Sequence, residues 1–519
     1  MDTKALRQKI LDLAIRGKLV PQDPNDEPAE VLLERIREQK QQMFKEGKLK
    51  KKDIKNDTII FKGEDNLHYE KFADGTVKCM EDEIPFEVPE GWAWCKLNDI
   101  YNFIDYRGAT PTKITNGIPL VTAKNVKSGY IDYTIDDYIS EEEFKERQQR
   151  GISKKGDILF TTEAPLGNAA LADMEKFSAG QRLITFQQYG SKNELINYVM
   201  LMFILSDFFQ QQLYVNKTGS TVAGIKAAIL KTLWIPVPPY NEQLRISNTL
   251  KSAINLIDSI SKNKEILSTS ISNTKSKILD LAIRGKIVPQ DPTDEPASVL
   301  LERIRAEKEE LIKQGKIKRD KKESVIFKGD DNSYYEKIGN KVNCIDEEIP
   351  FELSEGWAFI RLKTAWELIS GRDLSPSEYN DKNDGIPYIT GASNFRNGHI
   401  SLVRWTTVPQ VITRRGDLLL TCKGTIGEIA HNNFGEAHIA RQIMAIRNIY
   451  SLNVDFLALC IEYSMTKIKQ AANGLIPGIS REDILNLVIP IPPTKEQENI
   501  CNKLKATFSA IEHIEKSLN

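Results

Sequence analysis

One stretch of the sequence occurs twice, near the start of the chain and again just past its middle. Lys9–Arg37 reads KILDLAIRGKLVPQDPNDEPAEVLLERIR, and Lys277–Arg305 reads KILDLAIRGKIVPQDPTDEPASVLLERIR, so the copies differ at three of 29 positions. A repeat of this length decides the architecture before any local helix or strand is considered. The sequence therefore predicts two units of one fold in a single chain.

Shorter blocks recur after each copy, in the same order. They are EIPFEVPEGWAW (from Glu83) with EIPFELSEGWAF (from Glu348), KGDILFT (from Lys155) with RGDLLLT (from Arg415), and LWIPVPPYNEQ (from Leu233) with LVIPIPPTKEQ (from Leu487). Between these blocks the halves diverge. Residues 97–116 have no recognisable counterpart in 362–384, and 124–150 bear little resemblance to 392–414. A shared frame therefore carries two different variable surfaces.

The shared frame reads as helical. Through residues 241–284, apolar residues recur at alternating spacings of three and four, which is the period of a coiled-coil seam: Ile246, Leu250, Ala253, Ile257, Ile260, Leu267, Ile271, Ile278 and Leu281. At 1.5 Å per residue this segment predicts a rod of roughly 65 Å. Gly285 is placed to end it in a left-handed conformation.

The two ends of the chain share the same period. Ile500, Leu504, Ile511 and Leu518 form a seam that stops at the C-terminus, and Leu6, Ile10 and Leu13 continue it at the N-terminus. The simplest arrangement is a circular one, in which the chain is cut inside one of two long helices and its ends lie close together. A pseudo-two-fold axis across the two helices makes them antiparallel.

The expected fold class is therefore α+β, with two α+β variable domains separated by two long antiparallel coiled-coil helices. Short apolar strands are expected at 158–161 and 418–421, and helices at 196–213 and 454–472. The expected segments are 1–57 (N-terminal helical segment), 58–239 (first variable domain), 240–324 (central helical spacer), 325–493 (second variable domain) and 494–519 (C-terminal helix).

Composition narrows the class of protein. The 519 residues are 40% hydrophobic and 28% charged, as in ordinary globular proteins, and the longest apolar run is far short of the ~20 residues that span a bilayer. We therefore expect a cytoplasmic protein that is not associated with a membrane. The formal net charge of −1 argues against nucleic-acid binding through bulk positive charge and leaves only local patches.

The sequence contains no motif for catalysis or metal binding. The six cysteines are far apart without a CxxC pair, and there is no phosphate loop, GxGxxG, HExxH or GxSxG motif. The PPY at Pro238–Tyr240 resembles an amino-methyltransferase motif, but Val237 stands where that chemistry needs a polar residue. We expect no catalytic residue, no metal and no cofactor on this chain.

The combined motifs resemble the DNA-specificity subunit of Type I restriction-modification enzymes. The paired LDLAIRGK segments, the KGDIL and RGDLL strands, the loops TGSTVAGI (from Thr218) and NGLIPGI (from Asn473), and the two IPxPPxxEQ segments carry the resemblance over essentially the whole chain. It implies two target-recognition domains for double-stranded DNA and helical regions that bind two methyltransferase subunits. Restriction-translocase subunits join them, and S-adenosylmethionine, ATP and Mg²⁺ belong to the partner subunits.

The resemblance also implies that DNA contacts lie in the loops after GIP, after GDIL and around TGST. Arg and Lys can donate to guanine, and Asn and Gln can pair with adenine. The candidates in the first variable domain are Lys124, Asn125, Lys127, Thr162, Arg182, Lys217, Ser220 and Thr221, and those in the second are Asn394, Arg396, Arg404, Lys423, Thr425, Arg441 and Gln442.

Arg182 and Arg441 are the strongest of these candidates because both copies place an Arg/Gln pair at this point, Gln181-Arg182 and Arg441-Gln442. Two other readings stay open. The chain could be a coiled-coil scaffold that binds proteins and reads no DNA, or an enzyme whose site follows no recognised motif.

Overall fold

The computed structural model describes residues 2–54, 57–107, 110–134, 137–190, 194–219, 223–317, 319, 323–396, 398–450, 452–471 and 478–518. Ser220, Thr221 and most of the NGLIPGI loop lie outside these ranges. The chain divides into two compact units, residues 1–264 (unit 1) and 265–519 (unit 2). Both mix helices with small sheets, which confirms the expected mixed α and β class with two domains.

Unit 1 begins with helices and a small meander, which precede the variable sheets. The first elements are α1 (Thr3–Ile15), α2 (Ala29–Lys45), α3 (Lys51–Ile54), β1 (Ile59–Lys62), β2 (His68–Lys71), β3 (Val77–Cys79), β4 (Ala93–Lys96), α4 (Leu97–Ile100) and β5 (Tyr101–Asp105). They are followed by β6 (Ile118–Val121), β7 (Tyr138–Ile139), α5 (Glu141–Arg147), β8 (Ile158–Thr161), β9 (Ala169–Leu171), β10 (Ser178–Ala179), β11 (Leu183–Gln188), α6 (Asn197–Ile204), α7 (Asp207–Val215), α8 (Ala227–Leu230), β12 (Trp234–Val237) and α9 (Tyr240–Ile283), whose last turns belong to unit 2.

Unit 2 repeats this order with different connections. Its first elements are α10 (Ala297–Lys313), β13 (Ser324–Lys328), β14 (Tyr334–Ile338), β15 (Lys341–Cys344), β16 (Ala358–Arg361), α11 (Leu362–Ala365), β17 (Trp366–Ser370), β18 (Ile386–Ile389), β19 (Phe395–Arg396), β20 (His399–Ile400), β21 (Trp405–Thr406) and β22 (Ile412–Thr413). The remainder are β23 (Leu418–Thr421), β24 (Ile429–His431), β25 (Ala437–Ile439), β26 (Ile443–Asn448), α12 (Val454–Ala471), α13 (Arg481–Leu485), β27 (Val488–Ile491) and α14 (Thr494–Leu518).

The central sheet of each variable domain has the same topology. Its antiparallel strand order is β5-β11-β8-β9 in unit 1 and β17-β26-β23-β24 in unit 2. Strands β8 and β23 are buried on both faces. In β8, Ile158 and Phe160 pack into the main core of unit 1, while Leu159 faces a second, smaller core. A sheet held between two cores is a rigid base for the loops at its ends.

Divergent sequences build equivalent elements in this sheet. Residues 97–116 contain α4 and β5, and residues 362–384 contain α11 and β17, although no sequence match joins the two ranges. The expected strands at 158–161 and 418–421 are confirmed as β8 and β23. The single helix expected at 196–213 was wrong, because Ser206 accepts a hydrogen bond from the Phe209 N–H and starts a second helix.

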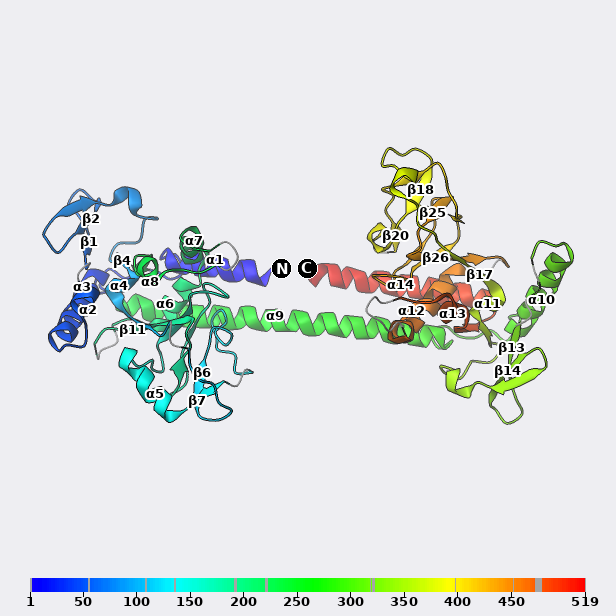
Figure 1. Ribbon diagram of the computed structural model, residues 1–519, viewed down its shortest axis with the longest axis horizontal. Helices are drawn as coiled ribbons and strands as arrows, with labels where there is room; N and C mark the ends of the chain where they lie inside the picture. The colour runs from blue at the N-terminus through cyan, green and yellow to red at the C-terminus, as the bar shows by residue number, and fades with distance from the viewer. Residues whose placement is uncertain are drawn as a thin grey trace. The chain divides into compact units, whose positions relative to one another are not determined.

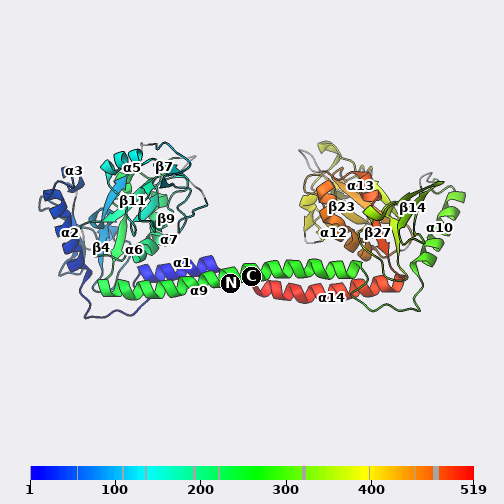
Figure 2. The same cartoon turned by 90° about the horizontal axis from the view of Figure 1, so that it is seen from below.

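The long helices pair within each unit. In unit 1, α1 lies along α9 in both views (Figures 1 and 2), with Arg7 paired to Asp258 and, further along the chain, Asp26 to Arg245. In unit 2, Glu515 of α14 pairs with Lys275 of α9 at 2.7 Å. Asp2, the N-cap of α1, is close enough to Lys264 to interact with its charge, and Arg7 pairs with Asp258, so α1 and α9 run antiparallel.

Burial along α9 matches the expected seam best in the first half of the helix, whereas near its C-terminal end Leu279, Ala282 and Ile283 are buried and the seam residues Ile278 and Leu281 are half-buried. Ile246, Leu250, Ile257 and Ile271 are buried, whereas Leu267 is 40% exposed. Gly285 ends the helix at φ +68°, and Gly17 ends α1 at φ +64°. A β-carbon on Gly17 would meet the Pro89 ring at 2.3 Å, so this turn requires glycine for space as well as for conformation.

Candidate nucleic-acid interface

A tight turn leads into the central strand of each variable domain. The Leu183 N–H donates to the Gly180 carbonyl at 3.2 Å, and the Ile443 N–H donates to the Ala440 carbonyl at 2.9 Å. The middle residues are Gln181 and Arg182 in the first turn and Arg441 and Gln442 in the second. We call these the first and second Arg/Gln turns.

Two other segments join the first Arg/Gln turn. The Thr162 N–H, just after β8, donates to the Arg182 carbonyl at 3.0 Å, and the Ile225 N–H donates to the Thr162 carbonyl at 3.0 Å. Together they enclose a polar pocket of about 370 Å³ lined by Arg107, Thr162, Glu163, Gln181, Arg182, Thr218, Gly224, Ile225 and Lys226. The loops after GDIL and around TGST therefore meet at one place.

The second variable domain repeats this junction. The Cys422 N–H donates to the Gln442 carbonyl at 2.8 Å, and the Ile479 N–H donates to the Cys422 carbonyl at 2.8 Å. Thr162 thus corresponds to Cys422, and the residues that follow them, Glu163 and Lys423, occupy matching positions with opposite charge. The backbone frame is shared and the exposed chemistry differs.

Each Arg/Gln turn carries one exposed ion pair. Arg182 Nε lies 3.1 Å from Glu163 Oε1, with side chains 51% and 46% exposed. Arg441 Nε lies 2.7 Å from Asp373 Oδ2, with side chains 66% and 42% exposed. Both arginines are therefore at the surface, and each is beside one carboxylate.

Most of the other predicted DNA-contact residues are also at the surface. Lys124, Lys217, Arg396, Lys423 and Thr425 are exposed, as is Gln442. Lys127 is half-buried and lies 3.8 Å from Asp132, Lys217 lies over the Tyr214 ring, and Arg404 is exposed and lies over the Tyr379 ring. Within the described residues, the pocket lined by Gln181 and Arg182 contains none of Lys124, Asn125 and Lys127 from the loop after GIP.

Three predicted residues point inward. Asn125 is 3% exposed, accepts from the Thr122 N–H and hydroxyl, and donates to the Asp132 carbonyl. Asn394 makes the same set of hydrogen bonds: it accepts from the Thr390 N–H and hydroxyl and donates to the Ser401 carbonyl. The buried Thr162 hydroxyl donates to the Arg182 carbonyl. These geometries give each a loop-bracing role, and DNA contact by their side chains stays a prediction. Ser220 and Thr221 lie outside the described residues.

Sequence reasoning missed four residues at these turns: Glu163, Asp373, Arg107 and Lys226. Arg107 makes a two-pronged contact with Asp105, which raises the pKa of its guanidinium, and donates to the Ile225 carbonyl. It therefore ties β5 to the TGST segment. The two carboxylates carried no sequence signal, because they come from non-matching positions of the repeat.

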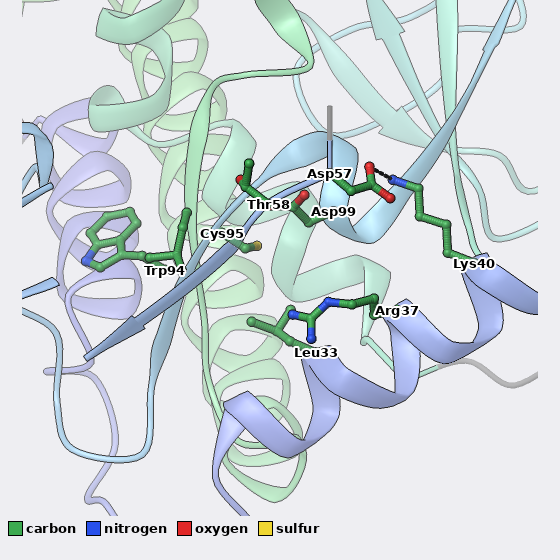
Figure 3. A pocket seen from close by; sticks show the side chains of 9 residues that line it. Leu33, Arg37, Lys40, Asp57, Thr58, Trp94, Cys95 and Asp99 are labelled. Atoms are coloured by element: carbon green, nitrogen blue, oxygen red, sulfur yellow. Dashed lines mark hydrogen bonds and ion pairs between the residues drawn. The ribbon is translucent and has the colours of Figure 1, made fainter. Parts of the chain in front are cut away.

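A smaller cavity lies under α2 in unit 1 (Figure 3). It measures about 30 Å³ and is lined by Leu33, Arg37, Lys40, Asp57, Thr58, Ile60, Trp94, Cys95 and Asp99. Lys40 reaches Asp57 at 2.7 Å across it, as the dashed line in Figure 3 shows, and also donates to the Asn98 carbonyl at 2.9 Å. A space of this size has room for only one or two waters, which favours a structural role for the cluster.

Metal and membrane features are absent from the described ranges. No group of three or more His, Cys, Asp or Glu side chains there is placed to hold a metal ion. Among the same residues, every helix is too short or too polar to cross a bilayer.

Comparison with known proteins identifies a family and a fold. A family model described as the Type I restriction modification DNA specificity domain matches residues 89–268 and 354–519. The EcoAI specificity subunit of Escherichia coli is 27% identical over 97% of this chain and 90% of its own length, and the EcoEI specificity subunit of Escherichia coli is 26% identical over 99% and 90%.

A solved structure from work on complex assembly and conformational transition of the type I R-M system shares this fold. It has a TM-score of 0.55 at 19% identity, and covers 84% of this chain and 94% of its own. Since the family model matches well over half of the sequence and falls once on each unit, the chain belongs to the Type I restriction-modification DNA specificity family.

Proposed function

We propose that the chain is the DNA-specificity subunit of a Type I restriction-modification complex and carries no catalytic site of its own. The first variable domain reads one half-site and the second reads the other. The site is bipartite and asymmetric, because the two domains share a backbone frame but present different exposed side chains. The observation that carries this proposal is the pair of Arg/Gln turns, each set at the end of a rigid central sheet.

Partner subunits complete the complex. Two methyltransferase subunits bind the repeated helical segments, since nearly identical surfaces imply identical partners, and restriction-translocase subunits join afterwards. S-adenosylmethionine, ATP and Mg²⁺ are held by those partners. The near-neutral net charge of the chain supports this division, because phosphate contacts dominate affinity for DNA and have to come from the partners.

The helical frame separates the two variable domains. Long helices with a seven-residue apolar period form this frame. The heptad pattern, with Ile246 and Leu250 buried in unit 1 and Ile500 and Leu504 buried in unit 2, supports coiled-coil packing of the frame.

The test is binding selection on a random duplex library by the chain co-purified with its methyltransferase partner. The expected result is one enriched motif made of two dissimilar half-sites with unread base pairs between them. A protein-binding scaffold would enrich no motif. As a further check, the isolated chain incubated with S-adenosylmethionine and DNA should transfer no methyl group, and transfer would instead indicate an enzyme.

A further inference from the structure

The two Arg/Gln turns carry their arginines at different positions of the turn. Arg182 is the second middle residue of its turn, and Arg441 is the first of its own. The acidic partner changes sides with the arginine. Glu163 follows β8, whereas Asp373 follows β17 on the other side of the turn.

The neighbouring positions are consistent with this exchange. Lys423 occupies the position of Glu163, so an arginine at the position of Gln442 would face a lysine. In the first turn the position of Arg441 is taken by Gln181, which accepts from the Thr110 hydroxyl at 2.8 Å. Each turn therefore has one arginine, and that arginine lies beside a carboxylate, Glu163 in the first turn and Asp373 in the second.

We propose that Glu163 and Asp373 are positioning residues for DNA readout, and that each arginine–carboxylate pair reads one G·C base pair of its half-site. This inference rests on the proposed function. In the major groove a G·C pair presents the guanine N7 and O6 acceptors beside the cytosine amino donor. An arginine next to a carboxylate presents two donors beside an acceptor, which is the complementary order.

The contact atoms fit this role. Both ion pairs use Nε, at 3.1 Å for Arg182 and 2.7 Å for Arg441. Within the described ranges no hydrogen bond engages the Nη atoms of either arginine, and Nε is the atom of each that pairs with its carboxylate. The carboxylate thus restrains the root of the guanidinium and leaves its terminal edge for a bidentate contact.

The local charge also favours a base over a phosphate. A guanidinium beside a carboxylate has a local charge near zero, and the carboxylate repels a phosphate at close range. A base edge carries no net charge, so the carboxylate does not oppose its approach. Because both partners are about half exposed, the pair contributes little to folding, and its removal leaves the fold intact.

The experiment measures base preference with the co-purified chain and methyltransferase complex on the duplex library described above. Glu163→Gln and Arg182→Lys should each lower discrimination for G·C about 5- to 150-fold at one position of the first half-site, the range expected for loss of a bidentate contact. The dependence of binding on salt should stay unchanged, since no phosphate contact is lost. Asp373→Asn and Arg441→Ala should act in the same way on the second half-site alone.

The matched control is Glu175→Gln, which removes another exposed ion pair of the same domain, with Lys155 at 2.7 Å, and should change no position. Equal weakening on every sequence, with a salt slope reduced by about one, would make Arg182 a phosphate contact and overturn the proposal. An unchanged motif in Glu163→Gln would overturn it as well. Failure of the proposed function looks different, because the wild-type complex would then select no motif.

Discussion

At the scale of single residues, the repeat provides matched pairs of buried sites. Asp157 and Asp417 occupy the same place before the central strands and are 7% and 3% exposed. Gln187 donates to Asp157 and to the Ile152 carbonyl, whereas Arg447 donates to Asp417 and to the Ile412 carbonyl. Burial raises the pKa of Asp157 to about 6, and hydrogen bonds from the Lys154 N–H and Gln187 offset only part of that shift.

The first prediction concerns Gln187→Arg, which gives the first variable domain the ion pair of the second. A carboxyl whose pKa is raised by folding contributes stability below its unfolded value of about 4, and this is lost as the pH rises through 6. In the wild type the first domain should therefore lose up to about 3 kcal/mol between pH 4 and pH 8. Gln187→Arg should remove most of this loss.

Hydrogen exchange of the β8 and β11 amides against pH measures this effect, with β23 and β26 of the same chain as an internal control. Arg447→Gln should impose the same pH dependence on the second domain. A wild-type profile in which both domains respond equally to pH would show that the Asp157 environment does not matter.

Residues in loops were the hardest to predict. Asn125 and Asn394 have the side chain of an adenine reader, yet their amides close the loops in which they lie. Composition and position in a loop do not determine which way an amide points, since the same donor and acceptor serve a base or the backbone. Arg182 and Arg441 were the strongest DNA-contact candidates because both copies place an Arg/Gln pair at this point, and both side chains are exposed, as such a contact requires.

At the scale of elements, α2 is joined to the first variable domain by a buried charge. Lys40 is 1% exposed, pairs with Asp57 and lies 4.9 Å from the centre of the Tyr189 ring. Burial raises the pKa of Asp57, and the charge of Lys40 opposes that shift. The matching Lys308–Glu323 pair under α10 is longer, at 3.2 Å, and more exposed.

Lys40→Ala should therefore destabilise unit 1 by about 3–5 kcal/mol, because it leaves the Asp57 carboxylate buried without a cation. Lys308→Ala, the matched change, should cost only about 1 kcal/mol, as expected for a more exposed pair. Urea unfolding followed by hydrogen exchange of β4 and β16 resolves the two units. Equal losses in both variants would contradict the role assigned to the buried pair.

The helical elements were predicted more fully than the sheets. The heptad spacing and Gly285 predicted the course and the end of α9, because many residues of a long helix contribute to its apolar period. Strands β5 and β17 were not recognised as equivalents, since many different apolar sequences can form one strand of a buried sheet. At the break between α6 and α7 the Ser206 hydroxyl caps the second helix, and Gln8 and Gln210 donate to the carbonyls that end the first.

At the scale of the whole molecule, the prediction concerns the helical spacer. Adding one heptad between Lys264 and Ile271, and one at the equivalent place near Leu518, preserves the seam and lengthens each rod by about 10 Å. At roughly 3.4 Å per base pair, the unread spacer should grow by about two to three base pairs while both half-sites stay the same. Methylation-site sequencing of the altered complex reads this length. An unchanged spacer with full activity would show that the helices do not set it.

The central claim is that this chain supplies the DNA sequence specificity of its complex. The most direct measurement is methylome sequencing of the host with and without the gene for this chain, with the partner subunits present in both. We predict that removal of the gene abolishes methylation at one asymmetric bipartite motif and leaves all other methylated motifs unchanged. Persistence of every methylated motif after removal would contradict the claim.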